Sequence, residues 1–157
     1  MTTPADRPSH VRVVAPPPLI FGVPLIAGLL LDRWRPLPFL PPGTAHLIGG
    51  VLAMGFLIGL PAVIAFRRAG TSPNPWRPVS ALVTGGPYRF TRNPMYLGML
   101  LLYLSASFWT DTLWPLFFLP LVLWVMQVGV IVREEAYLEE LFGEEYRAYR
   151  ARVRRWL

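Results

Sequence analysis

Four long apolar runs, separated by polar segments rich in proline and glycine, divide the chain. They cover about residues 18–31, 44–66, 94–109 and 113–132. Because a helix of about 20 apolar residues crosses a bilayer, the second and fourth runs are long enough to span one. The first run is shorter and contains Pro24, so the sequence leaves open whether it spans. The pattern predicts an all-α integral membrane protein with about four transmembrane helices.

Capping residues mark the boundaries of the later helices. Asn93 is a favourable N-cap and Pro94 a favourable first residue for the third apolar helix. The helical pattern of the fourth run continues, now with charged residues, as far as Gly143, a plausible C-cap. A further helix is expected over about residues 144–154, where tyrosines and many arginines are typical of an amphipathic interfacial helix.

Small residues in the second apolar run indicate close helix packing. Gly55 and Gly59 are four positions apart and therefore share one face of a helix. This spacing lets two membrane helices approach closely. We interpret the pair as packing residues rather than ligand contacts.

The chain is predicted to form a single domain preceded by a polar tail. Residues 1–15 are polar and irregular and lack the pattern of a cleaved signal peptide. A length of 157 residues suits one domain, and no internal repeat is present. We therefore expect one membrane-embedded domain over residues 16–157.

Composition excludes several classes of chemistry. The chain has no cysteine, so disulfides, thiolate metal sites and cysteine nucleophiles are excluded. With only two histidines, we predict that no metal is bound. No phosphate-binding loop, dinucleotide fingerprint or Ser-His-Asp pattern is present.

The positive charge follows the ends of the apolar runs. All fifteen basic residues are arginine, and the formal net charge is +6. Anionic lipid headgroups are therefore favoured over nucleic acid as the partner. With four spans, only Arg33 and Arg35 lie on one side of the membrane, and the other thirteen arginines lie on the opposite side. This uneven distribution predicts that both termini are cytoplasmic; if the first run does not span, the N-terminus moves outside. The absence of lysine is interpreted as the composition bias of a GC-rich bacterium, so we expect a bacterial inner-membrane protein.

Two charged blocks meet at the predicted cytoplasmic side, residues 85–98 and residues 133–135. Together they match the needs of a zwitterionic ligand. Its carboxylate would bind Arg92, which directly precedes a helix N-terminus with free N–H groups. Its ammonium would bind Glu134 or Glu135. Because neighbouring helical residues point about 100° apart, we expect one of this pair to face the site and the other to face solvent or an arginine.

Each block also has a simpler interpretation when taken alone. Arg89 and Arg92 are typical of residues that anchor a membrane helix at the lipid headgroups. Glu134 and Glu135 are typical of a solvated helix end. The hypothesis of a binding site therefore depends on the order and spacing of the two blocks along the chain.

That order resembles one known family. Gly-Gly-Pro-Tyr-Arg-x-x-Arg-Asn-Pro-x-Tyr-x-Gly, a helical hairpin, and then Arg-Glu-Glu occur within residues 70–154. This arrangement resembles integral-membrane methyltransferases, a group that includes isoprenylcysteine carboxyl methyltransferases and phospholipid N-methyltransferases. The resemblance implies S-adenosylmethionine as methyl donor and a lipophilic or small acceptor. The cofactor-binding residues it implies are Gly86, Tyr88, Arg92, Asn93, Pro94, Tyr96, Glu134 and Glu135.

The acceptor stays open between a carboxylate, an amine and a thiol. An amine must lose a proton, which Glu135 could accept. Members that methylate a carboxylate are expected to hold it with an arginine near the Phe-Gly step, where this chain has Leu141. Arg147 is the candidate to take that role, with Arg150 as a second choice. Many members have histidine where this chain has Asn93, which cannot act as a base near neutral pH.

A non-catalytic membrane protein is the alternative, either a scaffold or a complex subunit whose arginines only anchor it. A small transporter fragment is a third reading. The combination of Arg92 with Glu134 and Glu135 separates these hypotheses from an enzyme, because an anchor does not require it.

Overall fold

The computed structural model describes residues 11, 13–71 and 79–157. These residues form helices with no strand among them, which confirms the all-α expectation. Most of the polar tail and most of the loop at residues 70–78 lie outside the described residues. The helices are α1 (Pro17–Trp34), α2 (Ala45–Met54), α3 (Phe56–Arg68), α4 (Pro94–Trp109), α5 (Trp114–Met126), α6 (Val132–Phe142) and α7 (Glu144–Arg152), with a 3-10 turn η2 (Gly86–Arg89) and a π-helical turn η3 (Gln127–Ile131).

Three helical segments of the described chain are long and apolar enough to cross a membrane: Pro17–Trp34, Ala45–Arg68 and Trp114–Phe142. The first is α1, which the sequence left open; the others are α2 with α3, and α5 continued into α6. α4 is apolar but has 16 residues, or about 24 Å of helix, against a hydrocarbon core of about 30 Å. The protein is thus an integral membrane protein, and the fourth span stays a prediction.

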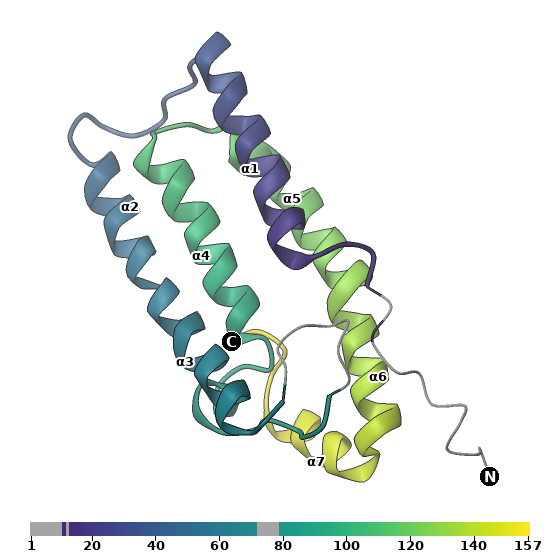
Figure 1. Cartoon of the computed structure of the whole chain (residues 1–157). Helices are drawn as coiled ribbons and strands as arrows, with labels where there is room; N and C mark the ends of the chain where they lie inside the picture. Colours follow the sequence, from purple (N-terminus) through teal and green to yellow (C-terminus); the bar gives the residue numbers. More distant parts are fainter. Residues whose placement is uncertain (1–10, 12, 72–78) are drawn as a thin grey trace.

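α4 is the central helix of the bundle. It lies between α2 and the pair formed by α1 and α5, and it contacts α1, α2, α3 and α5 (Figure 1). Two buried hydroxyls of α4 donate hydrogen bonds to neighbouring backbones: Ser105 to the Gly49 carbonyl at 2.8 Å and Tyr103 to the Pro115 carbonyl at 2.6 Å. These bonds fix α4 against α2 and α5 without leaving a polar group unsatisfied in an apolar interior.

Glycine residues allow the helices to approach each other closely. A Cβ atom added at Gly98 would lie 3.1 Å from the Cα atom of Gly59, so α3 and α4 meet backbone to backbone. Gly55 faces the Leu101 side chain of α4. The predicted packing role of Gly55 and Gly59 is therefore confirmed. The second run is one apolar segment with a turn at Gly55, where the backbone keeps helical angles (φ −61°, ψ −21°).

The last helices are gathered at one end of the bundle. α6 continues α5 through η3, and α7 follows a reversal at Gly143, where φ is 53° and ψ is −120°. This positive φ suits glycine, and the boundary confirms the predicted C-cap. α6 and α7 lie at the same end of the molecule as the end of α3 and the start of α4 (Figure 1). Tyr146 and Tyr149 of α7 pack with Tyr88, so α7 covers this end, and its location on a membrane surface stays a prediction.

Candidate functional site

A pocket lies where η2, the first turn of α4, α6 and α7 meet. Its charged groups come from the two blocks singled out in the sequence, and its aromatic rings come from the first block, α3, α6 and α7. Six of the predicted site residues line it: Tyr88, Arg92, Asn93, Tyr96, Glu134 and Glu135. Apolar side chains from several elements complete the wall, among them Val11, Phe66, Leu82, Met95, Ile131 and Leu138.

Arg92 is the buried cation of the pocket. Its side chain is 10% exposed, and its Nη2 atom lies 3.2 Å from Oε1 of Glu135. Its Nε and Nη1 atoms are buried without a well-formed hydrogen bond to any described residue. A buried donor without a partner is costly, and a charged one more so. These two atoms therefore favour a ligand that brings an acceptor, above all an anionic one.

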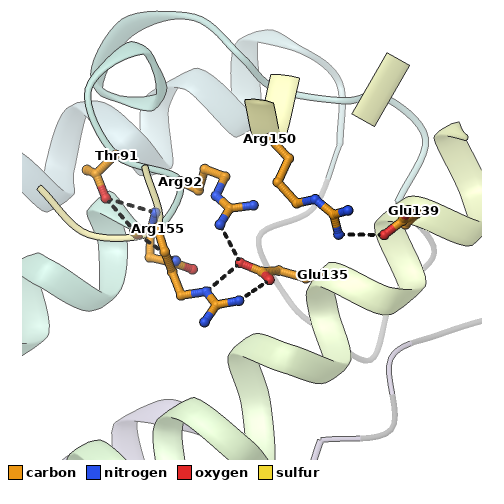
Figure 2. Close-up of polar contacts among 7 residues, drawn as sticks. Thr91, Arg92, Glu135, Glu139, Arg150 and Arg155 are labelled. Carbon is orange, nitrogen blue, oxygen red and sulfur yellow. Dashed lines mark hydrogen bonds and ion pairs between the residues drawn. The ribbon is translucent and has the colours of Figure 1, made fainter. Parts of the chain in front are cut away.

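Glu135 is shared between two arginines. Arg155 donates from Nε to Oε1 at 2.9 Å and from Nη2 to Oε2 at 2.6 Å. This bidentate arrangement is the strongest that a guanidinium and a carboxylate form. Arg92 contributes one additional, longer contact to Oε1. Figure 2 shows both arginines directed at the same carboxylate.

The segment before α4 holds residue 155 through its backbone. The Oγ1 atom of Thr91 and the Nδ2 atom of Asn93 both donate to the carbonyl of Arg155, at 3.0 and 2.9 Å. The backbone N–H of Arg92 donates to the Arg154 carbonyl at 2.9 Å. Asn93 does occupy the N-cap position of α4, but its side chain makes no capping bond. The bond from Nδ2 to the Arg155 carbonyl sets the orientation of the amide, and in that orientation Oδ1 accepts no capping bond from the first turn of α4.

Glu134 is held separately from Glu135. The Tyr96 hydroxyl donates to Oε1 of Glu134 at 2.6 Å, which joins the first turn of α4 to α6. We expected one member of the pair to face the site, whereas both line the pocket. The pocket surrounds the first turn of α6 on two sides, with Tyr96 on one and the arginines on the other, so adjacent side chains both reach it.

Tyrosines supply rings and hydroxyl donors. Tyr88 is buried, its ring packs edge-on against Phe66, and its hydroxyl has no partner among the described residues. Burial raises the pKa of Tyr88 well above its usual value. Burial, assisted by the charge of Glu135, raises the pKa of Tyr146 to about 12. Both hydroxyls therefore remain protonated at neutral pH, and that of Tyr88 is available to donate to a ligand.

Three predicted residues lie away from this pocket. Gly86, with φ 60°, lines a neighbouring shallow groove beside Arg68. Pro94 is buried as the first residue of α4. The Arg147 side chain is 47% exposed and pairs with Glu144 and Glu139 on the outer face of α7. Their proposed roles stay predictions.

Arg155 is the site residue that sequence reasoning missed. It lies in a strongly basic segment, which is typical of a solvated tail. The sequence did contain one signal, namely the apolar residues that flank Arg154 and Arg155. Val153 and Trp156 both pack against buried clusters. An alternation of basic and apolar residues indicates a segment that packs, but it does not identify the carboxylate that Arg155 binds.

The fold and the site define a small helical membrane protein with a charged and aromatic pocket at one end of its bundle. The family model for phospholipid methyltransferase matches residues 44–145. The chain therefore belongs to the phospholipid methyltransferase family, which confirms the resemblance read from the sequence. Membership indicates a membrane methyltransferase.

Two relatives match parts of the chain. An uncharacterised protein of Haemophilus influenzae is 42% identical over 65 residues, which cover 40% of this chain and all of that protein. The protein-S-isoprenylcysteine O-methyltransferase of Schizosaccharomyces pombe is 36% identical over 72 residues, which cover 46% of this chain and 30% of that enzyme. No solved structure matches the chain.

Proposed function

We propose that this protein transfers a methyl group from S-adenosylmethionine to a lipophilic or small acceptor at the cytoplasmic face of a bacterial inner membrane. Family membership supports the reaction class. The observation that carries the choice of donor is Arg92, a buried guanidinium with two unpartnered nitrogens inside the pocket. The amino-acid end of S-adenosylmethionine carries the carboxylate that such a group binds.

The remaining pocket residues fit the other parts of this donor. Tyr88, in the same pocket as Arg92, offers a buried hydroxyl that has no hydrogen-bond partner among the described residues. Glu134 places a carboxylate in the same pocket, suited to the ammonium or to the positively charged sulfur. Tyr146, Tyr149 and Phe66 supply ring faces and edges on which an adenine can pack. In our proposal the residues present therefore match all the chemical parts of the donor.

When bound, S-adenosylmethionine supplies a methyl group on a cationic sulfur. The methyl carbon is attacked by an acceptor lone pair, and S-adenosylhomocysteine is released. The protein contributes position, since the reacting atoms must lie about 3–3.5 Å apart and in line. Arg92 and Glu134 would fix one end of the donor, while the apolar wall excludes water from the reacting atoms.

An amine or thiol acceptor must also lose a proton. The sequence assigned this task to Glu135, but both oxygens of Glu135 are engaged by arginine. Glu134 accepts one hydrogen bond, from Tyr96, among the described contacts. The contacts therefore favour Glu134 as the proton acceptor and Glu135 as the residue that orders the arginines. Arg147 keeps its predicted role of holding an anionic acceptor, at the outer face of α7.

Calorimetry on the purified protein in detergent tests the donor. Wild-type protein should bind S-adenosylmethionine, and Arg92→Ala should weaken binding by about 1.5–3 kcal/mol because a charged hydrogen bond is lost. Arg89→Ala is the matched control, since Arg89 is exposed in the same segment and should bind as wild type. Folded wild-type protein that shows no binding would overturn the proposal.

Transfer of a labelled methyl group tests the reaction. The protein is supplied with labelled S-adenosylmethionine, a membrane lipid extract and a panel of small thiols, amines and lipophilic acids. Mass spectrometry of the products identifies the acceptor. Label that enters none of these classes, from protein that binds the donor, would contradict the proposed acceptor chemistry.

A further inference from the structure

We propose that Arg155 is a positioning residue for the donor site: it holds Glu135 so that Arg92 stays free to bind the ligand carboxylate. The inference rests on the proposed function, because it assumes that Arg92 receives the carboxylate of S-adenosylmethionine. It adds a residue from the far end of the chain whose side chain does not belong to the pocket wall.

The two arginines do not share the oxygens of Glu135 equally. Arg155 contacts both of them, at 2.9 and 2.6 Å, whereas Arg92 contacts one, at 3.2 Å. The paired fork of a guanidinium on a carboxylate is the preferred geometry. Arg155 occupies that geometry, so Arg92 cannot.

The consequence appears in the unpaired atoms of Arg92. Its Nε and Nη1 atoms make no well-formed hydrogen bond to a described residue, although a free carboxylate beside them would attract both. If Arg155 were removed, Glu135 would be free to turn and pair with Arg92. Arg155 therefore prevents an internal carboxylate from taking the place of the ligand's carboxylate.

Charge supports the same conclusion. Arg92, Arg155 and Glu135 together carry a net positive charge, which suits an incoming carboxylate, while Glu134 in the same pocket supplies a negative charge for the ligand's ammonium. Without Arg155, Arg92 and Glu135 form a neutral pair in a buried location. Both effects of losing Arg155 act against a ligand carboxylate, and neither acts against a ligand that lacks one.

Hydrogen bonds to the backbone fix the position of Arg155. Thr91 and Asn93 bind its carbonyl oxygen, and Arg92 binds the carbonyl of Arg154 through its own N–H. Three consecutive residues before α4 are thus bonded to two consecutive residues after α7. Figure 2 shows Thr91, Arg92 and Arg155 gathered beside Glu135. The cation that restrains Glu135 is fixed to the same segment that carries Arg92.

A purely structural ion pair would behave differently. If Arg155 only stabilised the fold, its loss would weaken the binding of every ligand to a similar degree. A positioning role affects ligands that carry a carboxylate. The test therefore compares S-adenosylmethionine with its decarboxylated form, which keeps the sulfonium and the amine but lacks the carboxylate.

Calorimetry measures both ligands with wild-type protein, Arg155→Ala and Arg155→Lys. We expect wild type to prefer S-adenosylmethionine by about tenfold or more, as a charged hydrogen bond provides. Arg155→Ala should lose most of this preference while binding the decarboxylated form as before. Arg155→Lys, which offers a point charge in place of the fork, should retain part of it. Arg154→Ala is the control, because only the backbone of Arg154 contacts this site.

The possible outcomes separate the two proposals. Wild-type protein that binds neither ligand overturns the proposed function. Wild-type protein that binds both equally overturns the assignment of the carboxylate to Arg92, and this inference with it. A preference that survives unchanged in Arg155→Ala, or equal weakening of both ligands, overturns the role of Arg155 alone. If Arg155→Ala does not fold, Arg155→Lys is used instead. A preference for S-adenosylmethionine as large as that of wild type in Arg155→Lys would then overturn the role of Arg155.

Discussion

The hydroxyl of Tyr149 donates a 2.8 Å hydrogen bond to the backbone carbonyl of Tyr88, 61 residues earlier in the chain. Both residues are buried and belong to one cluster of packed aromatic and aliphatic side chains. The bond fastens α7 to the turn that leads into α4. It thereby joins the two parts of the chain between which the pocket forms.

Removing this hydroxyl should loosen the fold. Tyr149→Phe leaves the Tyr88 carbonyl buried without its donor, and we expect a loss of about 1–2 kcal/mol of stability. Thermal unfolding in detergent measures it. Tyr137→Phe is the matched control, because the Tyr137 hydroxyl makes no hydrogen bond to any described residue. Equal midpoints for the two variants would contradict the importance of the bond.

Replacing Glu134 should separate donor binding from turnover. With an amine or thiol acceptor, Glu134→Gln should lower the methyl-transfer rate by about a hundredfold, the scale of general base catalysis. Donor affinity should also fall, because Glu134 is proposed to hold the positively charged part of the donor, so the rate is measured at saturating donor. Glu140→Gln, at an exposed position of the same helix, should retain wild-type activity. A full rate in Glu134→Gln would return the role to Glu135.

Adjacent glycines in α2 should respond differently to alanine. A Cβ atom at Gly49 would lie 2.7 Å from the backbone nitrogen of Trp109, whereas one at Gly50 would meet its nearest atom, in the Trp109 ring, at 3.6 Å. Gly49→Ala should therefore destabilise the protein by about 1–3 kcal/mol through overpacking. Gly50→Ala should be near neutral. Thermal midpoints of the two variants decide whether α2 and α4 pack as closely as described.

Single cysteines can establish the orientation, because the chain has none of its own. Thr110→Cys, at the turn between α4 and α5, and Ala151→Cys, on α7, replace exposed residues at opposite ends of the bundle. We expect an impermeant maleimide to label Thr110→Cys from outside intact cells and Ala151→Cys only after permeabilisation. Labelling of both from one side would contradict the predicted topology.

Arg147 can be tested independently of the donor pocket. Its contacts are with Glu144 and Glu139 on the outer face of α7, so Arg147→Ala should bind S-adenosylmethionine as wild type. If it holds an anionic acceptor, the KM for that acceptor should rise. An unchanged KM would remove Arg147 from the acceptor site. Arg152→Ala, in the same helix, provides the control.

Structural features that depend on neighbouring residues could be predicted from the sequence. Apolar runs, the Asn93-Pro94 start of α4 and the turn at Gly143 follow from short-range rules on burial, capping and backbone freedom. The family pattern also led to six of the residues that line the pocket, Arg92, Glu134 and Glu135 among them. Each of these signals is contained in a few neighbouring residues.

Structural features that depend on contacts between distant residues could not be predicted from the sequence. Asn93 makes no capping bond, and its amide is instead oriented by the bond from Nδ2 to the carbonyl of Arg155, 62 residues later. In the sequence, Arg155 belongs to an ordinary basic segment. Only the structure shows that it lies beside Glu135. Both glutamates reach the pocket because different elements approach α6 from two sides. A local sequence pattern does not predict which distant residues will be in contact. The charged contacts of the site are all of this kind.

The continuity of α5 and α6 has a mechanical consequence. Glu134 and Glu135 lie on the continuous helical segment Trp114–Phe142, which includes the π-helical turn η3 and is long and apolar enough to cross a membrane. A tilt of that helix to suit a thinner or thicker bilayer moves both carboxylates relative to Arg92, which is carried by a separate segment. Under the proposed function, we therefore expect the affinity for the methyl donor to depend on bilayer thickness.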